Sequence, residues 1–151
     1  MTDHNSPRSQ PKVKAYARNA AFCAEAVLAK DSHYPTLNLE VARKPAGRDD
    51  YDWNSKLVIQ LSKQELPELA ALTLGHINNL KFSRNDCGIE IDRQKTGLYL
   101  RASRKSVIAM PITRSDCFRL SMLTLSRLEA SSLCSTEALL AALAGAFKPA
   151  D

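Results

Sequence analysis

The sequence predicts an α+β protein with antiparallel sheets and an extra helix near the C-terminus. Two observations support this fold class. Short runs alternate apolar and polar residues, as a strand with one buried face does. These runs fall into two consecutive groups, and a helix signal closes each group. Runs of strands followed by a helix are typical of antiparallel sheets rather than of alternating strand and helix units.

The first group contains the strand candidates up to residue 62. In KVKAYAR (12–18), small apolar side chains share one side of the chain, and the other side carries Lys14, Tyr16 and Arg18. A run around Phe22 to Ala29 alternates less clearly and fits either a strand or an irregular segment. TLNLEVAR (36–43) and KLVIQLS (56–62) place an apolar residue at every second position, so both are expected strands.

A helix is expected directly after these strands. Ser62 and Glu65 match the capping box, in which each side chain satisfies a free backbone N–H at the start of a helix. Pro67 falls near the first turn, where its missing N–H costs little. Gly75 then provides a natural C-terminal end.

The second group repeats this plan, with strand candidates at 80–84, 88–93, 97–103 and 106–112. Thr113 and Asp116 offer another capping box, and an apolar helix face follows. A third helix is expected at 136–147, where TEALLAALAGAF is almost entirely apolar. Such a helix must be covered, either by the core of its own chain or by another subunit.

The composition is that of one ordinary globular domain. The chain has 151 residues, of which 44% are hydrophobic and 25% charged, and this suits a single core. Residues 1–11 show no hydrophobic period, so we expect a flexible tail. No run approaches the roughly 18 apolar residues of a membrane span, and the N-terminus lacks the features of a signal peptide. We therefore expect a cytoplasmic protein with no membrane partner.

We expect no catalytic, metal or cofactor site. The four cysteines are widely spaced and the three histidines lack ligand spacing, whereas zinc needs clustered ligands. The sequence contains no nucleophile elbow, no His-Glu-x-x-His and no glycine-rich phosphate loop. Asp49, Asp50 and Asp52 lie in a polar connection, where solvated carboxylates are the usual explanation. The protein is therefore expected not to be an enzyme.

Positive charge gathers in the strand-rich stretches. Residues 1–48 carry eight Lys or Arg against four Asp or Glu, and residues 76–113 carry seven against three. Basic and aromatic side chains share strand faces there: Lys14, Tyr16 and Arg18 on one strand, Lys81 on another, Tyr99 and Arg101 on a third. Cations that follow a phosphate backbone and rings that stack on unpaired bases form the usual single-strand-binding surface. The ordinary alternative is a half-exposed sheet that presents such residues to water.

One segment adds a family resemblance. DDYDWNSKLVIQLSKQEL (49–66) resembles the hallmark stretch of the Whirly family, in which a Tyr-Asp-Trp triplet precedes a lysine, an apolar strand and a Leu-Ser…Glu-Leu helix start. The matching residues are Tyr51, Asp52, Trp53, Lys56, Leu61, Ser62, Glu65 and Leu66. A similar triplet occurs in the kinetoplastid mitochondrial guide-RNA-binding proteins. Tyr51 and Trp53 could instead pack at a sheet edge, with Asp52 fixing a turn by bonding nearby backbone N–H groups.

Other segments extend the resemblance over residues 12–130, in pieces. KVKAY (12–16) resembles the K-G-K-A-A motif associated with DNA binding in Whirly proteins, with Val13 in place of the glycine. GLYLRAS (97–103) and AMPITRSDCFRL (109–120) resemble the late strands and the entry to the final helix. The resemblance implies two β-β-β-β-α repeats, a doubled form of the transcriptional-coactivator single-strand-binding domain. Residues 131–151 then add the apolar helix and a tail.

The chain departs from plant Whirly proteins in two ways. We expect no organelle transit peptide, and the apolar helix at 136–147 is an addition. Both departures suggest a compact bacterial relative encoded by a mobile element. The candidate nucleic-acid contacts are then the basic and aromatic residues of the matching strands: Lys12, Lys14, Tyr16, Arg18, Lys56, Lys81, Tyr99 and Arg101.

The leading hypothesis is a sequence-tolerant single-stranded DNA-binding protein that acts in DNA replication, repair or transfer. One alternative is a single-stranded RNA-binding or annealing factor, because no residue here distinguishes RNA from DNA by its 2′-hydroxyl. Another is a protein-assembly module without nucleic-acid binding.

The helices carry more apolar surface than one chain is expected to bury, which favours a homo-oligomer. The residues behind this expectation are Leu120, Leu123, Leu125 and Leu128 on one helix and Leu139, Leu140, Leu143 and Phe147 on the other. The Whirly resemblance implies a tetramer rather than a dimer.

Overall fold

The computed structural model describes residues 11–147, so residues 1–10 of the predicted tail and residues 148–151 lie outside the described part. The elements follow one another in the order β1 (Lys12–Tyr16), β2 (Ala20–Leu28), β3 (Pro35–Arg43), a 3-10 turn at Trp53–Ser55, β4 (Leu57–Gln60), α1 (Glu65–Leu74), β5 (Asn79–Ser83), β6 (Gly88–Gln94), β7 (Gly97–Arg104), β8 (Ser106–Thr113), α2 (Arg114–Ala130) and α3 (Thr136–Ala146).

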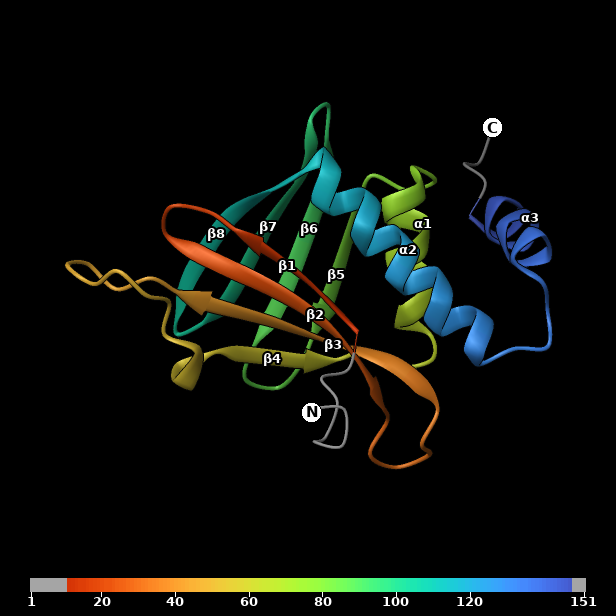
Figure 1. Ribbon diagram of the computed structural model, residues 1–151, viewed down its shortest axis with the longest axis horizontal. Helices are drawn as coiled ribbons and strands as arrows, with labels where there is room; N and C mark the ends of the chain where they lie inside the picture. Colours follow the sequence, from red (N-terminus) through yellow and green to blue (C-terminus); the bar gives the residue numbers. More distant parts are fainter. Residues whose placement is uncertain (1–10, 148–151) are drawn as a thin grey trace, which may run out of the picture.

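Two four-stranded antiparallel sheets make up the strand part of the fold (Figure 1). The first sheet has the order β1-β2-β3-β4, and the second sheet has the order β5-β6-β7-β8. Because α1 follows the first sheet and α2 the second, the expected pair of β-β-β-β-α repeats with an extra C-terminal helix is confirmed. The ambiguous run around Phe22 is a strand, which pairs with β1 on one side and β3 on the other.

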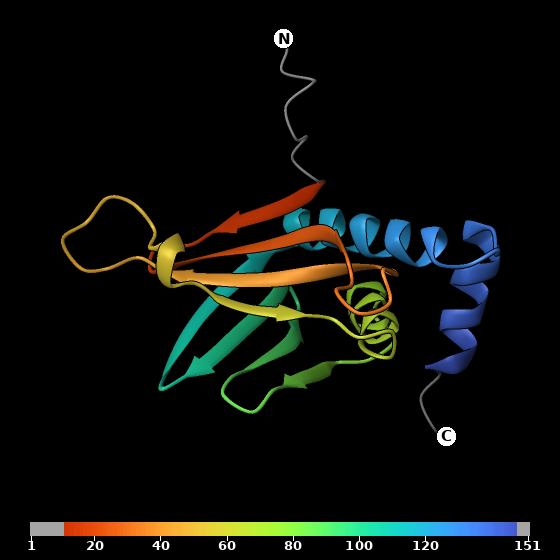
Figure 2. The same ribbon diagram turned by 90° about the horizontal axis from the view of Figure 1, so that it is seen from below.

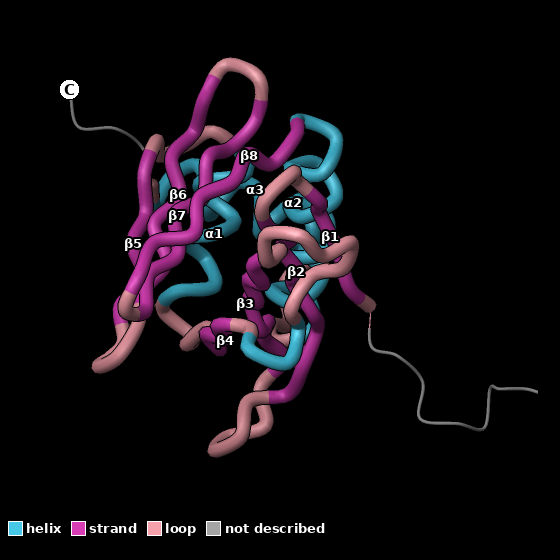
Figure 3. Tube along the Cα trace, turned by 90° about the vertical axis from the view of Figure 1, so that its left-hand side faces the viewer, coloured by secondary structure: helices cyan, strands magenta, loops and turns pink. Residues whose placement is uncertain are grey.

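Both sheets share one hydrophobic core with α1 and α2, and α3 adds Leu143 to it. Its members include Leu39 and Ile59 from the first sheet and Ile91 and Leu100 from the second. Figure 2 shows the first sheet above the second, with α1 and α2 beside them, and Figure 3 shows the same layers from the side. Since side chains alternate along a strand, each sheet keeps its other face turned away from this core.

Arginine side chains connect the two repeats. Arg127 of α2 donates from Nε to the carbonyl oxygen of Thr36 (3.1 Å) and from Nη2 to that of Val27 (2.7 Å), so the second repeat's helix is bonded to the first sheet. Arg93 of β6 donates from Nη1 to the carbonyl oxygen of Leu72 at 2.7 Å. It thereby gives a second donor to a carbonyl in the last turn of α1, which also accepts from Gly75 N (3.1 Å).

The predicted helix caps are present. Ser62 N donates to Glu65 Oε1 (2.9 Å) and Glu65 N donates to Ser62 Oγ (3.1 Å), which is the reciprocal capping box. Gly75 ends α1 with a positive φ of 90°, a conformation that suits glycine. At α2 only half of the box forms, because Thr113 Oγ1 accepts from Asp116 N while the Asp116 carboxylate pairs with Arg119.

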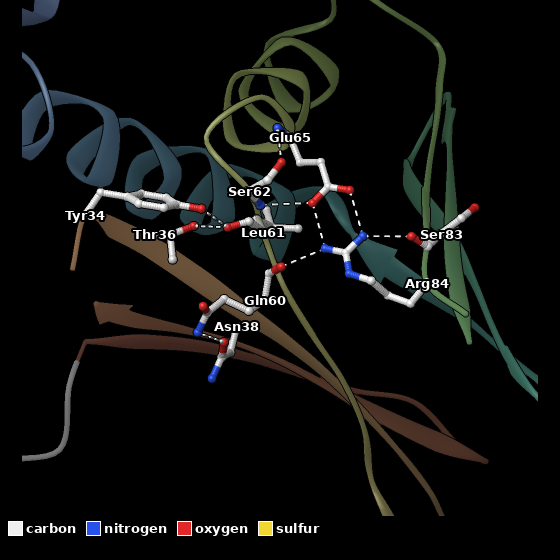
Figure 4. A network of polar contacts seen from close by, with 9 residues as sticks. All are labelled: Tyr34, Thr36, Asn38, Gln60, Leu61, Ser62, Glu65, Ser83 and Arg84. Atoms are coloured by element: carbon white, nitrogen blue, oxygen red, sulfur yellow. Dashed lines mark hydrogen bonds and ion pairs between the residues drawn. The ribbon is translucent and has the colours of Figure 1, made fainter. Parts of the chain in front are cut away.

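The capping box of α1 is also the centre of a polar network between the repeats (Figure 4). Arg84, just after β5, donates two hydrogen bonds to Glu65, from Nη2 to Oε1 (2.7 Å) and from Nη1 to Oε2 (2.9 Å). Its Nη2 also donates to the carbonyl oxygen of Gln60 at the end of β4 (2.7 Å). Burial would raise the pKa of Glu65, but the hydrogen bonds from Arg84 and Ser62 outweigh it and hold the pKa below its ordinary value.

The surplus of apolar helix surface is smaller than the sequence suggests. Leu120, Leu123 and Leu128 of α2 are buried in the core that the helix shares with the sheets, and Leu143 is buried where α3 lies near α1 and α2 (Figure 1). The large apolar side chains that α2 exposes are instead Phe118 (65%) and Met122 (55%). Between residues 11 and 147, every helix falls short of the length and apolar character that a bilayer-crossing segment requires.

We predict that Glu65→Gln lowers the free energy of unfolding by about 1–3 kcal/mol at pH 7, because Arg84 loses its charged acceptor. The ordinary pKa is 4.5 and the folded one is lower, so the pair's contribution is complete above pH 4.5 and is lost as pH falls through the folded value. The difference between variant and wild type in urea unfolding should therefore shrink below pH 4.5.

Glu68→Gln is the matched control in the same helical turn. Burial, and then the charge of Glu65, raise the pKa of Glu68, so its ionised form opposes folding and this effect grows as pH rises. The control should leave stability at pH 7 unchanged or slightly higher. A loss of stability equal to that of Glu65→Gln would show that the Arg84 contact is not responsible.

Candidate nucleic-acid interface

The outward face of the first sheet is built by the alternation of its strands. Lys14 of β1 lies opposite Cys23 of β2, which lies opposite Glu40 of β3. Tyr16 occupies the same face, two residues further along β1, opposite Ala21. The apolar residues that alternate with them, Val13 and Ala15, face the core, as the sequence predicts.

The segment between β3 and β4 brings the Tyr-Asp-Trp triplet to this face. Tyr51 Oη donates to the carbonyl oxygen of Ala17 (2.7 Å), which ties the segment to the end of β1. The rings of Tyr16 and Tyr51 lie 5.5 Å apart between centroids, at 42°. We call Tyr16, Tyr51 and Trp53 the aromatic cluster.

Lysine side chains lie over two rings of the aromatic cluster. Lys14 Nζ lies 5.2 Å from the centroid of Trp53, and Lys44 Nζ lies 5.7 Å from that of Tyr51. Both distances are within the range of a cation–π contact. Tyr16 is 58% exposed, and Tyr51 and Trp53 are half-buried. The face thus presents aromatic rings and ammonium groups side by side.

The residues beneath this layer are closed off from water. Cys23 faces outward between Lys14 and Glu40, yet it is only 2% exposed. Burial, and then the nearby charge of Glu40, raise the pKa of its thiol. Neighbouring side chains therefore shield this part of the sheet from water, and Tyr51 has a structural role through its hydrogen bond to Ala17.

Asp52 does not fix its turn in the way that the sequence suggests. Its side chain makes no capping hydrogen bond to the 3-10 turn that follows. The backbone does this work, because Asp52 N donates to the carbonyl oxygen of Arg43 (2.8 Å) and its own carbonyl accepts from Ser55 N (3.2 Å). Because main-chain hydrogen bonds hold this turn, the side chains in the sequence could not indicate how it is fixed.

The other basic residues predicted near this face differ in their surroundings. Lys12 Nζ lies 3.8 Å from Glu25 Oε2, and Lys56 Nζ lies 3.1 Å from Glu40 Oε1, so each is paired with a carboxylate. Arg18 does not share the strand face of Lys14 and Tyr16, because β1 ends at Tyr16 and Arg18 lies exposed in the turn to β2.

Lys81, Tyr99 and Arg101 lie together on the outward face of the second sheet. Arg101 Nη2 is 2.6 Å from Asp92 Oδ2 and 3.4 Å from Glu90 Oε1. Hydrogen bonds from Asn79 and then from Arg101 lower the pKa of both carboxyl groups. The charges of this face are therefore largely balanced, which the charge count of the sequence does not reveal.

The predicted contact residues thus fall on two separate sheets. The structure brings Lys14 and Tyr16 together with residues that pattern analysis missed as contacts, namely Lys44, Tyr51 and Trp53. The triplet itself is the signal for Tyr51 and Trp53, whereas Lys44 lies in a connection without periodicity. Within residues 11–147, no three His, Cys, Asp or Glu side chains gather where they could hold a metal ion.

The fold is similar to that in crystal structures of MRP1/MRP2 from Trypanosoma brucei. The TM-score is 0.58, and the match covers 82% of this chain and 94% of that chain at 12% sequence identity. Such low identity supports a shared fold alone. No family model and no curated protein matches the sequence, so the Whirly resemblance rests on its short segments alone.

Proposed function

We propose that this protein binds single-stranded nucleic acid, with single-stranded DNA as the leading substrate, through the outward face of the first sheet. The observation that carries the proposal is the aromatic cluster with Lys14 and Lys44 against its rings. Stacking on an aromatic ring needs an unpaired base and tolerates any base, since every base has a π-face. Lysines beside the rings meet the phosphates between stacked bases.

The fold and the family resemblance support the same proposal. The Whirly segments imply a doubled single-strand-binding domain, and the structure has its two β-β-β-β-α repeats. RNA is the alternative substrate, because the triplet is similar to that of the kinetoplastid guide-RNA-binding proteins. The proposed role is binding without catalysis. Action in DNA replication, repair or transfer, and origin in a mobile element, belong to the same proposal.

We predict that the protein binds single-stranded DNA more tightly than duplex DNA of equal length. Trp53 is the only tryptophan of the chain, so quenching of its fluorescence reports on the proposed surface directly. Single-stranded RNA should be titrated in parallel to establish the substrate. Affinity should fall with rising salt, since phosphate contacts release counterions. Equal affinity for single strands and duplex, or no binding at low salt, would contradict the proposal.

Two variants locate the binding face in the same titration. Tyr16→Ala should cost about 1–3 kcal/mol of binding free energy with little change in salt slope, and Lys14→Ala should reduce the slope by about 0.7. Lys95→Ala, in the turn between β6 and β7, is the control for the lost charge. Tyr99→Ala is the comparison on the second sheet, and it should cost less than Tyr16→Ala because the charges around Tyr99 are balanced.

A homo-oligomer, with a tetramer favoured, is part of the proposal. Phe118 and Met122 are one helical turn apart and both exposed, and adjacent exposed apolar side chains often mark an interface. Light scattering should give a multiple of 16.7 kDa, and Phe118→Asp with Met122→Asp should dissociate it. Val107→Asp, exposed on the second sheet, is the control. A wild-type mass of one chain at micromolar concentration would contradict the oligomer.

A further inference from the structure

Basic side chains without a carboxylate partner gather at one end of the two sheets. Some cations of the described part, such as Lys12, Lys56, Arg84 and Arg101, have a carboxylate oxygen within 4.0 Å, whereas scattered ones such as Lys95 and Arg114 do not. Within residues 11–147, five cations on neighbouring turns have no carboxylate oxygen within 4.0 Å. These are Arg18, Arg43, Lys44, Arg104 and Lys105. A polyanion gains most from cations that it need not win from a carboxylate, since a paired charge is already neutralised.

Arg43 and Arg104 cross between the sheets at this end. Arg43, the last residue of β3, donates from Nη2 to Ser106 Oγ at 2.9 Å. Arg104, the last residue of β7, donates from Nη2 to the carbonyl oxygens of Ser55 (3.1 Å) and Lys56 (3.4 Å). Neutral acceptors thus orient both guanidinium groups, and neither has a carboxylate oxygen within 4.0 Å among residues 11–147. Each guanidinium has five N–H donors, so donors remain for a ligand.

Two adjoining hollows surround these arginines. One, of about 170 Å³, is lined by Arg43, Arg104 and Ser106 among others. The other, of about 410 Å³, shares Arg104 and Ser106 and adds Lys105. Asp52 lines the first hollow and Asp86 the second, so each hollow also contains one opposing charge. Arg43 directly precedes Lys44, whose ammonium lies against Tyr51, and the first hollow therefore adjoins the aromatic cluster.

The backbone of Lys105 is unusual for a lysine. It has a φ of +70° at the tip of the turn between β7 and β8, a region that glycine adopts more easily than any residue with a Cβ. A residue kept in an unfavourable conformation is a reason to look for a function of its side chain. Here that side chain lines the second hollow.

We infer that Arg43 and Arg104 form a phosphate-binding site between the two sheets, extended by Lys105, that holds the backbone of a single strand beyond the aromatic cluster. Arginine suits this site, because its planar fork matches two phosphate oxygens at once. The inference rests on the proposed function and adds the path that the bound nucleic-acid strand follows. The strand leaves the outward face of the first sheet across this end, toward the turn between β7 and β8.

The test compares Arg43→Gln/Arg104→Gln with the matched control Lys95→Gln/Arg114→Gln, which removes the same charge at the turn between β6 and β7 and at the start of α2. Single-strand binding releases about 0.7 counterion per phosphate contact. The first variant should therefore lower the salt slope by about 1.4 and weaken binding of a 20-nucleotide strand about 25-fold at 0.1 M salt. The control should leave the slope near that of the wild type.

Two further variants separate binding from folding. Lys105→Gly removes the backbone strain and the charge together, so Tm should stay equal or rise while affinity falls about fivefold. Asp52→Asn removes the opposing carboxylate from the first hollow and should tighten binding. Equal slopes for the arginine variant and its control overturn the site and leave the proposed function standing. A wild type that binds no single strand overturns both.

Discussion

The bond between Glu65 and Arg84 fixes how the two repeats meet, and the surfaces depend on that relation. One carboxylate caps α1 through Ser62 and accepts both arms of an arginine from the second repeat. The same arginine binds the last carbonyl of β4. The end of the first sheet, the start of its helix and the end of β5 are therefore held as one unit. Charge-assisted hydrogen bonds with two parallel donors combine strength with a defined geometry. This contact therefore restricts both the orientation of the two repeats and the distance between them.

The same alternation that buries one face of the first sheet creates the candidate binding face on the other. Val13 and Ala15 enter the core, which turns Lys14 and Tyr16 outward. The connection from β3 to β4 then adds Tyr51 beside Tyr16 and Trp53 beside Lys14. The strand partners of Tyr16 and Lys14 are the small residues Ala21 and Cys23, which are buried although they point away from the core. Small residues in the sheet thus leave room for large rings above it. The lysines complete the surface by lying against those rings rather than against carboxylates.

Local sequence signals predicted the fold well, whereas contacts between residues far apart in the sequence could not be predicted from them. Alternation identified the clear strands, and Ser62, Glu65 and Gly75 marked the limits of α1, because each signal acts within a few residues. Alternation could not show that Arg101 meets Glu90 and Asp92, since that pairing depends on strand register. Nor could it place Arg18 beyond the end of β1, or show that Lys44 lies against Tyr51. The family triplet indicated Tyr51 and Trp53, but their surroundings arise from tertiary packing.

Photochemical crosslinking tests most directly the claim that single strands bind the outward face of the first sheet. A 20-nucleotide strand with photoreactive pyrimidines would be irradiated with the full-length protein, and the modified peptides identified by mass spectrometry. Rings that stack on bases lie close enough to react, so we expect adducts at Tyr16, Tyr51 or Trp53 that unlabelled single strands suppress and duplex DNA does not. Adducts confined to α2, α3 or the second sheet, with none on the aromatic cluster, would contradict it.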